Sequence, residues 1–224
     1  GGDGGGVGFV PNAYMSWALS KDLYLGLGLG APFGLKTDYD NPWVGGAQSL
    51  KFDIKTYNIN PSIAYRVNEM VSLGFGISWQ RMEAEYDRVV GVNSAPITGV
   101  TPFPLNTSKA IFNGDDDSWG WNVGALFRIS PATKVGVSYR SAIKHTLDGD
   151  LRVDGPYAPL NAASTSPASA EIKLPDTFIL SVSQMLGDRW EMLGDISWTS
   201  WSTVNKVDVV RNSGVLAQRL DTEF

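Results

Sequence analysis

The chain has 224 residues with no cysteine, one histidine, 18 basic against 23 acidic side chains and a formal net charge of −5. Without cysteine and with a single histidine, it can form neither a disulfide framework nor a Cys/His zinc site, and it offers no thiol nucleophile. The acidic balance argues against a nucleic-acid partner, because phosphate binding needs a basic face. The chain contains no run of 18 apolar residues, so the sequence predicts no transmembrane helix.

Alternation of apolar with small or polar residues predicts β-strands along the whole chain. The clearest segment is 71–79, in which five large apolar residues alternate with Gly and Ser. No stretch of comparable length has helical spacing. The sequence predicts eight strands, whose periodic parts in chain order are 9–19, 23–29, 57–65, 71–79, 119–123, 135–139, 178–182 and 190–198.

The connections between these strands alternate in length. The short ones are 20–22, 67–69, 130–133 and 187–188, and the long ones are 33–50, 89–115, 151–169 and the stretch from Arg211 onward. Short turns at one end and long loops at the other are typical of an outer-membrane β-barrel, whereas the alternative, a soluble β-sandwich, does not need this asymmetry. The predicted fold class is therefore all-β, an antiparallel transmembrane β-barrel, with residues 1–224 as part of a single barrel domain.

The apolar face changes sides along the strand predicted for 70–88. As one strand it would run about 60 Å, twice the hydrocarbon thickness, so it has to project beyond the membrane on the long-loop side. Beyond Trp79 the outward positions become charged and the inward ones become Met82, Ala84, Tyr86 and Arg88. The preceding strand repeats the pattern, with Leu50, Phe52 and Ile54 inward and Lys51, Asp53 and Lys55 outward.

An apolar interior in the outer half of a barrel favours a binding site for a hydrophobic ligand, with Arg88 as the partner of an anionic head group. The alternative is that Met82, Ala84 and Tyr86 pack against a plug or an infolded loop while Arg88 pairs with an acidic loop residue. In the seventh strand Glu171 and Lys173 would point inward unless a bulge at Pro175 reverses the register.

Two further features have the residue types of a site. His145 falls on the outward face of the sixth strand with Ile143 and Leu147, which argues against a catalytic role. The run 115–117 of three aspartates could bind a divalent cation, but such a run is more often a solvated loop. The sequence predicts no metal site and no cofactor.

Several short motifs occur in an order that resembles the outer-membrane long-chain fatty acid transporter family of the FadL/TodX type. The resemblance covers nearly the whole chain. It is carried by Val10-Pro11-Asn12, Ala31-Pro32-Phe33-Gly34-Leu35, Asn58-Ile59-Asn60-Pro61-Ser62-Ile63-Ala64-Tyr65-Arg66, Trp119-Gly120-Trp121-Asn122-Val123-Gly124, Val137-Ser138-Tyr139-Arg140-Ser141, Leu174-Pro175-Asp176 and Thr199-Ser200-Trp201-Ser202.

The resemblance implies a 14-stranded barrel plugged by an N-terminal hatch, which releases hydrophobic substrates sideways into the membrane beside a kinked third strand. By that comparison the chain lacks the hatch, the first strand and the last several strands. The kink and lateral opening are expected at Gly34, after Pro32 and Phe33, with an ordinary turn at the strand end as the alternative. Arg88 matches a family arginine that contacts the fatty acid carboxylate, and Arg219 is expected as a second basic partner.

Together these observations predict a passive channel in the outer membrane of a Gram-negative bacterium that needs no cofactor and is not an enzyme. Its expected substrate is a long-chain fatty acid or another hydrophobic small molecule, and its other expected partners are outer-membrane lipid and lipopolysaccharide. A channel for aromatic hydrocarbons and a general porin for small polar solutes remain alternatives. The residues expected to contact ligand are Arg88, Met82, Ala84, Tyr86, Phe52, Ile54 and Arg219.

Overall fold

The computed structural model describes residues 10–40, 46, 49–90, 108–155, 161, 165–203, 206–214 and 216–221. These residues form a 13-stranded sheet in which every strand pairing is antiparallel. Within them, no helix has the length and apolar character needed to cross a membrane.

The elements in chain order are β1 (Asn12–Ala18), β2 (Leu23–Gly30), β3 (Gly34–Asp38), β4 (Lys51–Arg66), β5 (Val71–Val90), β6 (Ser108–Ser130), β7 (Thr133–Arg140), β8 (Ile143–Asp154), β9 (Ser166–Leu174), β10 (Thr177–Met185), β11 (Glu191–Thr199), the short 3-10 helix η1 (Trp201–Thr203), β12 (Lys206–Arg211) and β13 (Leu216–Asp221).

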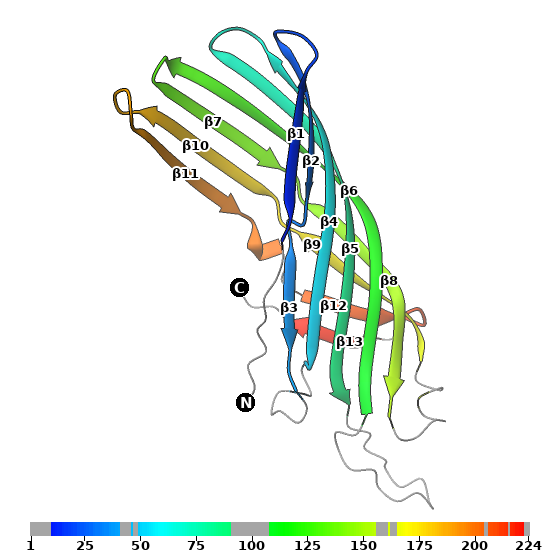
Figure 1. Cartoon of the computed structure of the whole chain (residues 1–224). Helices are drawn as coiled ribbons and strands as arrows, with labels where there is room; N and C mark the ends of the chain where they lie inside the picture. Colours follow the sequence, from blue (N-terminus) through cyan, green and yellow to red (C-terminus); the bar gives the residue numbers. More distant parts are fainter. Residues whose placement is uncertain are drawn as a thin grey trace, which may run out of the picture.

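The sheet has two halves that share β4, β5 and β6. In the first, which we call the short-turn half, one part of these strands joins β1, β2, β7, β10 and β11, and the hairpin turns gather at one end of Figure 1. In the second, the long-loop half, their other part joins β3, β8, β9, β12 and β13. Among the described residues the sheet is not closed, because β1 and β3 end it on one side and β11 and β13 on the other.

The predicted short turns are confirmed, but the described residues form thirteen strands where eight were predicted, because several predicted strands are interrupted and β3 and β13 lie in predicted loops. The strands of the short-turn half are separated by the predicted turns, and long intervals separate β3 from β4, β5 from β6 and β8 from β9. The prediction for the stretch after Arg211 was wrong: a tight turn with Gly214 at a φ of 80° leads directly into β13. Glycine suits this turn because residues with a Cβ rarely adopt a positive φ.

Breaks in several strands decide which side chains face inward. From Arg140 to Asp148 the chain advances eight residues, whereas the partner β6 advances only seven, from Asn122 to Asp115. A shift of one residue moves every following side chain to the other face of the sheet. β10 and β9 pair with β7 and β8 in one continuous register across the break at Pro175. The side chains of β9 therefore change faces together with those of β8.

Two expectations about side-chain direction are decided by this shift. Glu171 and Lys173 are exposed and face outward, while Ile172 is buried. This is the reversed register that the sequence analysis had allowed for a break at Pro175. His145 was expected outward and is instead 0% exposed, facing inward with Leu147. The outward prediction was wrong because it carried the alternation of β7 across the break at 141–142 into β8.

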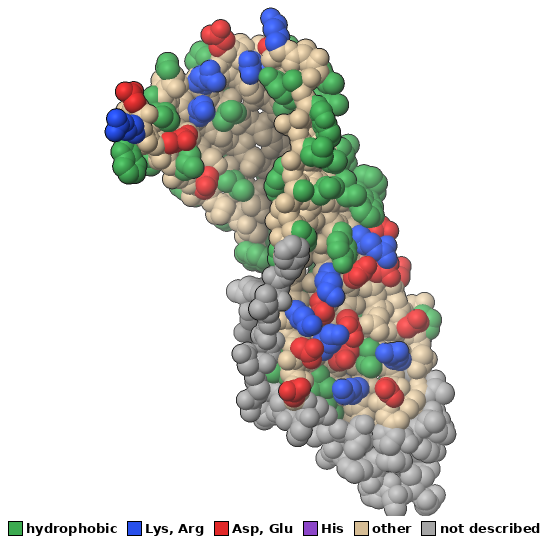
Figure 2. Space-filling model, viewed as in Figure 1, with side chains coloured by type: hydrophobic (Ala, Val, Ile, Leu, Met, Phe, Trp, Pro, Cys, Tyr) green, Lys and Arg blue, Asp and Glu red, His purple; other side chains and the backbone are tan. Residues whose placement is uncertain are grey.

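The outer surface of the two halves differs in chemistry. Large apolar side chains are exposed along the short-turn half, whereas Lys, Arg, Asp and Glu cover the long-loop half (Figure 2). Phe75 is 45% exposed and Trp119 is 66% exposed. An exposed apolar belt of this kind is what a surface in contact with lipid requires.

The buried core lies inside the long-loop half. Its inner faces supply one apolar cluster from β5, β6, β8, β9 and β12, and β12 passes behind β4 and β5 in Figure 1. This half is therefore rolled around its own apolar side chains. The cluster consists of Met82, Ala84, Tyr86, Ala110, Phe112, Leu147, Leu151, Ala168, Ala170, Ile172, Leu174, Val207 and Val209.

Candidate functional site

The apolar residues predicted to face inward lie together. Met82, Ala84 and Tyr86 belong to the buried cluster, and Phe52 and Ile54 pack against it from β4. The rings of Phe52 and Tyr86 meet edge to face, with centroids 6.1 Å apart. The inverted alternation seen in the sequence therefore corresponds to an apolar interior in the long-loop half.

This interior is filled by side chains in the described part of the chain. Met82 and Leu147 have no exposed surface, and Val207 and Val209 from β12 close the cluster on its far side. Met82, Ala84 and Tyr86 thus pack against the opposite wall of the sheet. The alternative considered from the sequence was packing against a plug or an infolded loop. Binding of a ligand among these side chains requires the two walls to move apart.

Arg88 continues the inward face of β5 beyond Tyr86, opposite Ala110 of β6. It is partly buried. Burial raises the pKa of the Tyr86 phenol above its ordinary value, and the positive charge of Arg88 opposes this shift, so the two side chains lie within electrostatic reach. Arg219 pairs through its backbone with Asp208 on the hairpin β12–β13, and its predicted role as a second basic partner stays a prediction.

The break between β2 and β3 coincides with the predicted kink. It covers 31–33, directly before Gly34. The buried hydroxyl of Thr56 accepts a hydrogen bond from the Phe33 amide at 2.9 Å and donates one to the Phe33 carbonyl at 2.6 Å. These bonds replace the strand ladder where it is interrupted, since buried backbone groups need partners. The predicted function of Pro32, Phe33 and Gly34 as a lateral opening stays a prediction.

A polar layer follows the break on the inner face of the short-turn half, and the sequence analysis did not identify it. The Asn60 amide donates hydrogen bonds to Ser78 at 3.0 Å and to Asn122 at 2.7 Å. Asn58 is 7% exposed, and its Oδ1 has no hydrogen-bond partner. A groove of about 160 Å³ lies beside these residues and beside Pro32. The interior of the chain is therefore apolar in one half and polar in the other.

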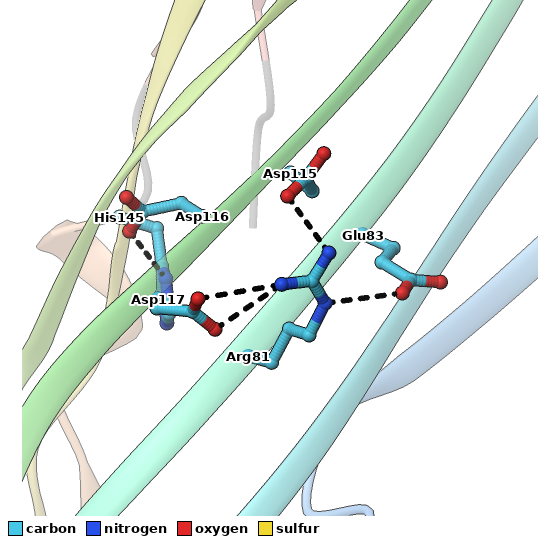
Figure 3. A network of polar contacts seen from close by, with 6 residues as sticks. All are labelled: Arg81, Glu83, Asp115, Asp116, Asp117 and His145. Carbon is cyan, nitrogen blue, oxygen red and sulfur yellow. Dashed lines mark hydrogen bonds and ion pairs between the residues drawn. The ribbon is translucent and has the colours of Figure 1, made fainter.

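His145 joins β8 to β5 and β6 inside the sheet. Its Nδ1 lies 2.9 Å from an Asp116 carboxylate oxygen, and its Nε2 lies 3.0 Å from Oε1 of Gln80. Figure 3 shows the contact with Asp116. Burial lowers the pKa of His145, and the Asp116 carboxylate opposes this shift. The three side chains supply a buried polar contact next to the apolar cluster.

The aspartates 115–117 lie on β6, not in a loop as expected. Asp115 and Asp117 face outward and bind Arg81 at 2.9 and 3.3 Å, and Arg81 also contacts Glu83 at 3.3 Å (Figure 3). In the described ranges, no group of three or more His, Cys, Asp or Glu side chains is arranged to hold a metal ion. Asp115 and Asp117 thus belong to an exposed ion-pair network with Arg81, which contributes little to stability.

We expect the stability of the full-length protein to fall as the pH drops through about 6.5. The pKa of His145 is lowered from 6.5 in the folded chain, so the unfolded chain binds the proton more readily. The stabilisation is fully present above 6.5 and is lost as the pH falls towards the folded pKa. Urea unfolding at pH 8 and pH 5, for wild type and His145→Gln, measures this effect. An equal loss in both proteins would contradict it.

Comparison with known proteins decides the family. A family model described as "Outer membrane protein transport protein (OMPP1/FadL/TodX)" matches residues 1–223. The chain belongs to this family. Outer membrane protein P1 of Haemophilus influenzae is 28% identical over 89% of this chain and 47% of its own length. A long-chain fatty acid transport protein of Salmonella typhi is 25% identical over 92% of this chain and 51% of its own length.

Solved structures agree on the fold. A Pseudomonas aeruginosa FadL homologue superposes with a TM-score of 0.82 at 21% identity, over 95% of this chain and 53% of that one. The CymD monoaromatic hydrocarbon channel superposes with a TM-score of 0.70 at 16% identity, over 96% of this chain and 60% of that one. The chain of this FadL/TodX family member spans about half the length of the relatives it matches. The predicted barrel class, outer-membrane location and family are thereby confirmed.

Proposed function

We propose that the full-length protein takes up long-chain fatty acids by passive diffusion through the apolar interior of its barrel. The observation that carries the proposal is the inner face of β5. Three buried apolar side chains, Met82, Ala84 and Tyr86, lead along this face to the partly buried cation Arg88. An apolar wall ending in a guanidinium suits an acyl chain that ends in a carboxylate.

Further observations support this assignment. Burial of each methylene contributes about 0.8 kcal/mol, so an acyl chain gains enough to enter an apolar interior. The relative from Salmonella typhi is named a long-chain fatty acid transport protein, which favours a channel and not an enzyme. The break at 31–33 lies beside this interior, because Phe33 packs against the apolar cluster. It is the proposed exit towards the membrane.

The remaining proposals concern the surroundings of the barrel. We place 1–224 in a single barrel domain whose exposed apolar belt contacts lipid acyl chains. The charged outer wall of the long-loop half then faces the lipopolysaccharide head groups. The acidic charge balance and the mixed outer wall of the described residues disfavour a nucleic-acid partner.

Aromatic hydrocarbons are the second candidate substrate. The CymD channel, which shares the fold, is named for monoaromatic hydrocarbons. A neutral aromatic ligand would need the apolar cluster but would give Arg88 no anionic partner. The two substrates therefore differ in whether they depend on this arginine.

Binding of oleate to the full-length protein in detergent, for wild type and Arg88→Ala, tests the proposal. In Arg88→Ala, loss of a hydrogen bond to a charged group should weaken the binding free energy of oleate by about 1.5 to 3 kcal/mol. Arg81→Ala is the matched control, since Arg81 lies on the same strand but faces outward in an ion-pair network. Its oleate affinity should equal that of wild type.

Toluene as a neutral competitor separates the remaining cases. If toluene binds while oleate does not, the protein is a hydrocarbon channel. If neither ligand binds, the apolar cluster is only packing, and the ligand assignment of Arg88 is wrong. Conductance for small polar solutes without binding of either ligand would favour the porin alternative.

A further inference from the structure

One arginine on the inner face of the short-turn half, Arg140, lies at the end of β7. Its neighbour Tyr139 faces outward, with its ring 5.4 Å from that of the exposed Trp121. Because side chains alternate along a strand, Arg140 faces the lumen. It lines the same groove as Pro32, Asn58 and Asn60.

Arg140 has room because small residues share its level. Consecutive strand pairings place Gly26, Ser62, Gly76, Asn122 and Arg140 in one row across the inner face. A Cβ at Gly76 would lie 2.8 Å from Asn122 Oδ1, so this glycine lets Asn122 and Asn60 meet above it. Arg140 lines the groove beside this row.

The groove contains a partly buried cation and a buried amide oxygen that have no partner among the described residues. In the part of the chain that the structure describes, the Arg140 guanidinium has neither an ion pair nor a hydrogen bond with another residue. The nearly buried Asn58 leaves its Oδ1 without a donor. Buried polar atoms rarely stay unpaired. A hydrated anion supplies both partners, an acceptor for the arginine and water protons for the amide oxygen.

We infer that Arg140 forms a second carboxylate-binding site, distinct from the one proposed at Arg88. Along β5, Arg88 lies 12 residues beyond Gly76, the level of Arg140, which is roughly 40 Å at 3.3 Å per residue. The two arginines therefore belong to separate sites. The second lies beside the break at 31–33 and receives the head group of an amphiphile that moves from the apolar interior towards the exit.

This inference rests on the proposed uptake of fatty acids, and its test is arranged to fail separately. The full-length Arg88→Ala protein is titrated with oleate and with oleyl alcohol, which has no carboxylate. We expect a residual preference for oleate in this background. Adding Arg140→Gln should weaken oleate about tenfold to a hundredfold, the range for a lost charged hydrogen bond, and leave oleyl alcohol unchanged.

The matched control is Lys134→Gln in the same background. Lys134 lies on the same face of the same strand and loses the same charge, but it is not among the residues of the groove. It should keep the preference for oleate. Arg140→Lys, which retains the charge, should restore part of the oleate affinity, and heat-modified migration on gels reports whether each variant is folded.

Three results would overturn the inference. The Arg88→Ala protein could lack any preference for oleate, or Arg140→Gln could leave that preference intact. Equal weakening of both ligands by Arg140→Gln would show that the arginine only supports packing. In each case oleate binding by wild type at Arg88 would still stand, whereas absence of oleate binding by wild type would refute the proposed function itself.

Discussion

Replacing Leu147 with alanine should lower the free energy of unfolding of the full-length protein by about 2 to 5 kcal/mol. Leu147 has no exposed surface and lies in the apolar cluster with Met82. Removing its side-chain atoms loses their transfer free energy and leaves a cavity that the neighbouring strands cannot fill. Urea unfolding in lipid vesicles measures the difference.

The neighbouring residue supplies the control for Leu147. Asp148 is exposed on the opposite face of β8, so Asp148→Ala should change stability by no more than about 0.5 kcal/mol. A cost below about 1 kcal/mol for Leu147→Ala would contradict a packed core. It would mean that in the full-length protein this side chain faces a fluid interior.

A ligand gives a second measurement on the same variants. A cavity lined by apolar side chains can take up an acyl chain, and a ligand that binds only the folded state stabilises it. Oleate should therefore return part of the stability lost in Leu147→Ala, relative to its effect on Asp148→Ala. Equal effects of oleate on both variants would show that the acyl chain does not reach the apolar cluster.

The sequence alone predicted the change of surface chemistry along β5. This strand is continuous, so its alternation can be followed from Phe75 to Tyr86 without knowledge of its neighbours. Along this strand the apolar side chains face outward in the short-turn half and inward in the long-loop half. The tight turns of the short-turn half were equally accessible, because local residues determine them; the turn after Arg211 was not recognised.

The orientation of β8 was not accessible in this way. The shift that reverses it is a relation between β8 and β6, and a break at 141–142 separates it from the alternation of β7. The sequence nonetheless contained a signal. Leu147 is apolar, whereas Lys144 and Asp148 at the alternate positions of the strand are charged. The rule already found for Met82 and Glu83 would therefore have turned His145 inward.

The polar groove was missed for a related reason. Asn60 and Asn122 are 62 residues apart and meet only across Gly76 of the strand between them. Alternation places each asparagine on the inner face, but strand order and register are needed to bring them together. The position of Arg140 in this groove could not be predicted for the same reason, since the row of residues at its level is defined by four successive strand pairings.

Gly149→Ala should be among the most damaging single substitutions, with an expected cost of about 3 kcal/mol or more from overpacking. Gly149 pairs with Gly114 in the ladder between β8 and β6, after the register shift at 141–142. A Cβ at Gly149 would overlap the carbonyl oxygen of Asn113 and lie 2.7 Å from the Gly114 Cα. Both contacts are to backbone atoms, so no side chain can turn away to relieve them.

Gly194→Ala provides the control, because a Cβ at Gly194 on β11 meets no atom within 4 Å. This variant should fold with the yield and stability of wild type, whereas Gly149→Ala should unfold at lower urea concentration or fail to fold. A stability of Gly149→Ala within about 0.5 kcal/mol of wild type would contradict the close approach. It would mean that β8 lies farther from β6. It would therefore also contradict the register shift that turns His145 and Leu147 into the interior.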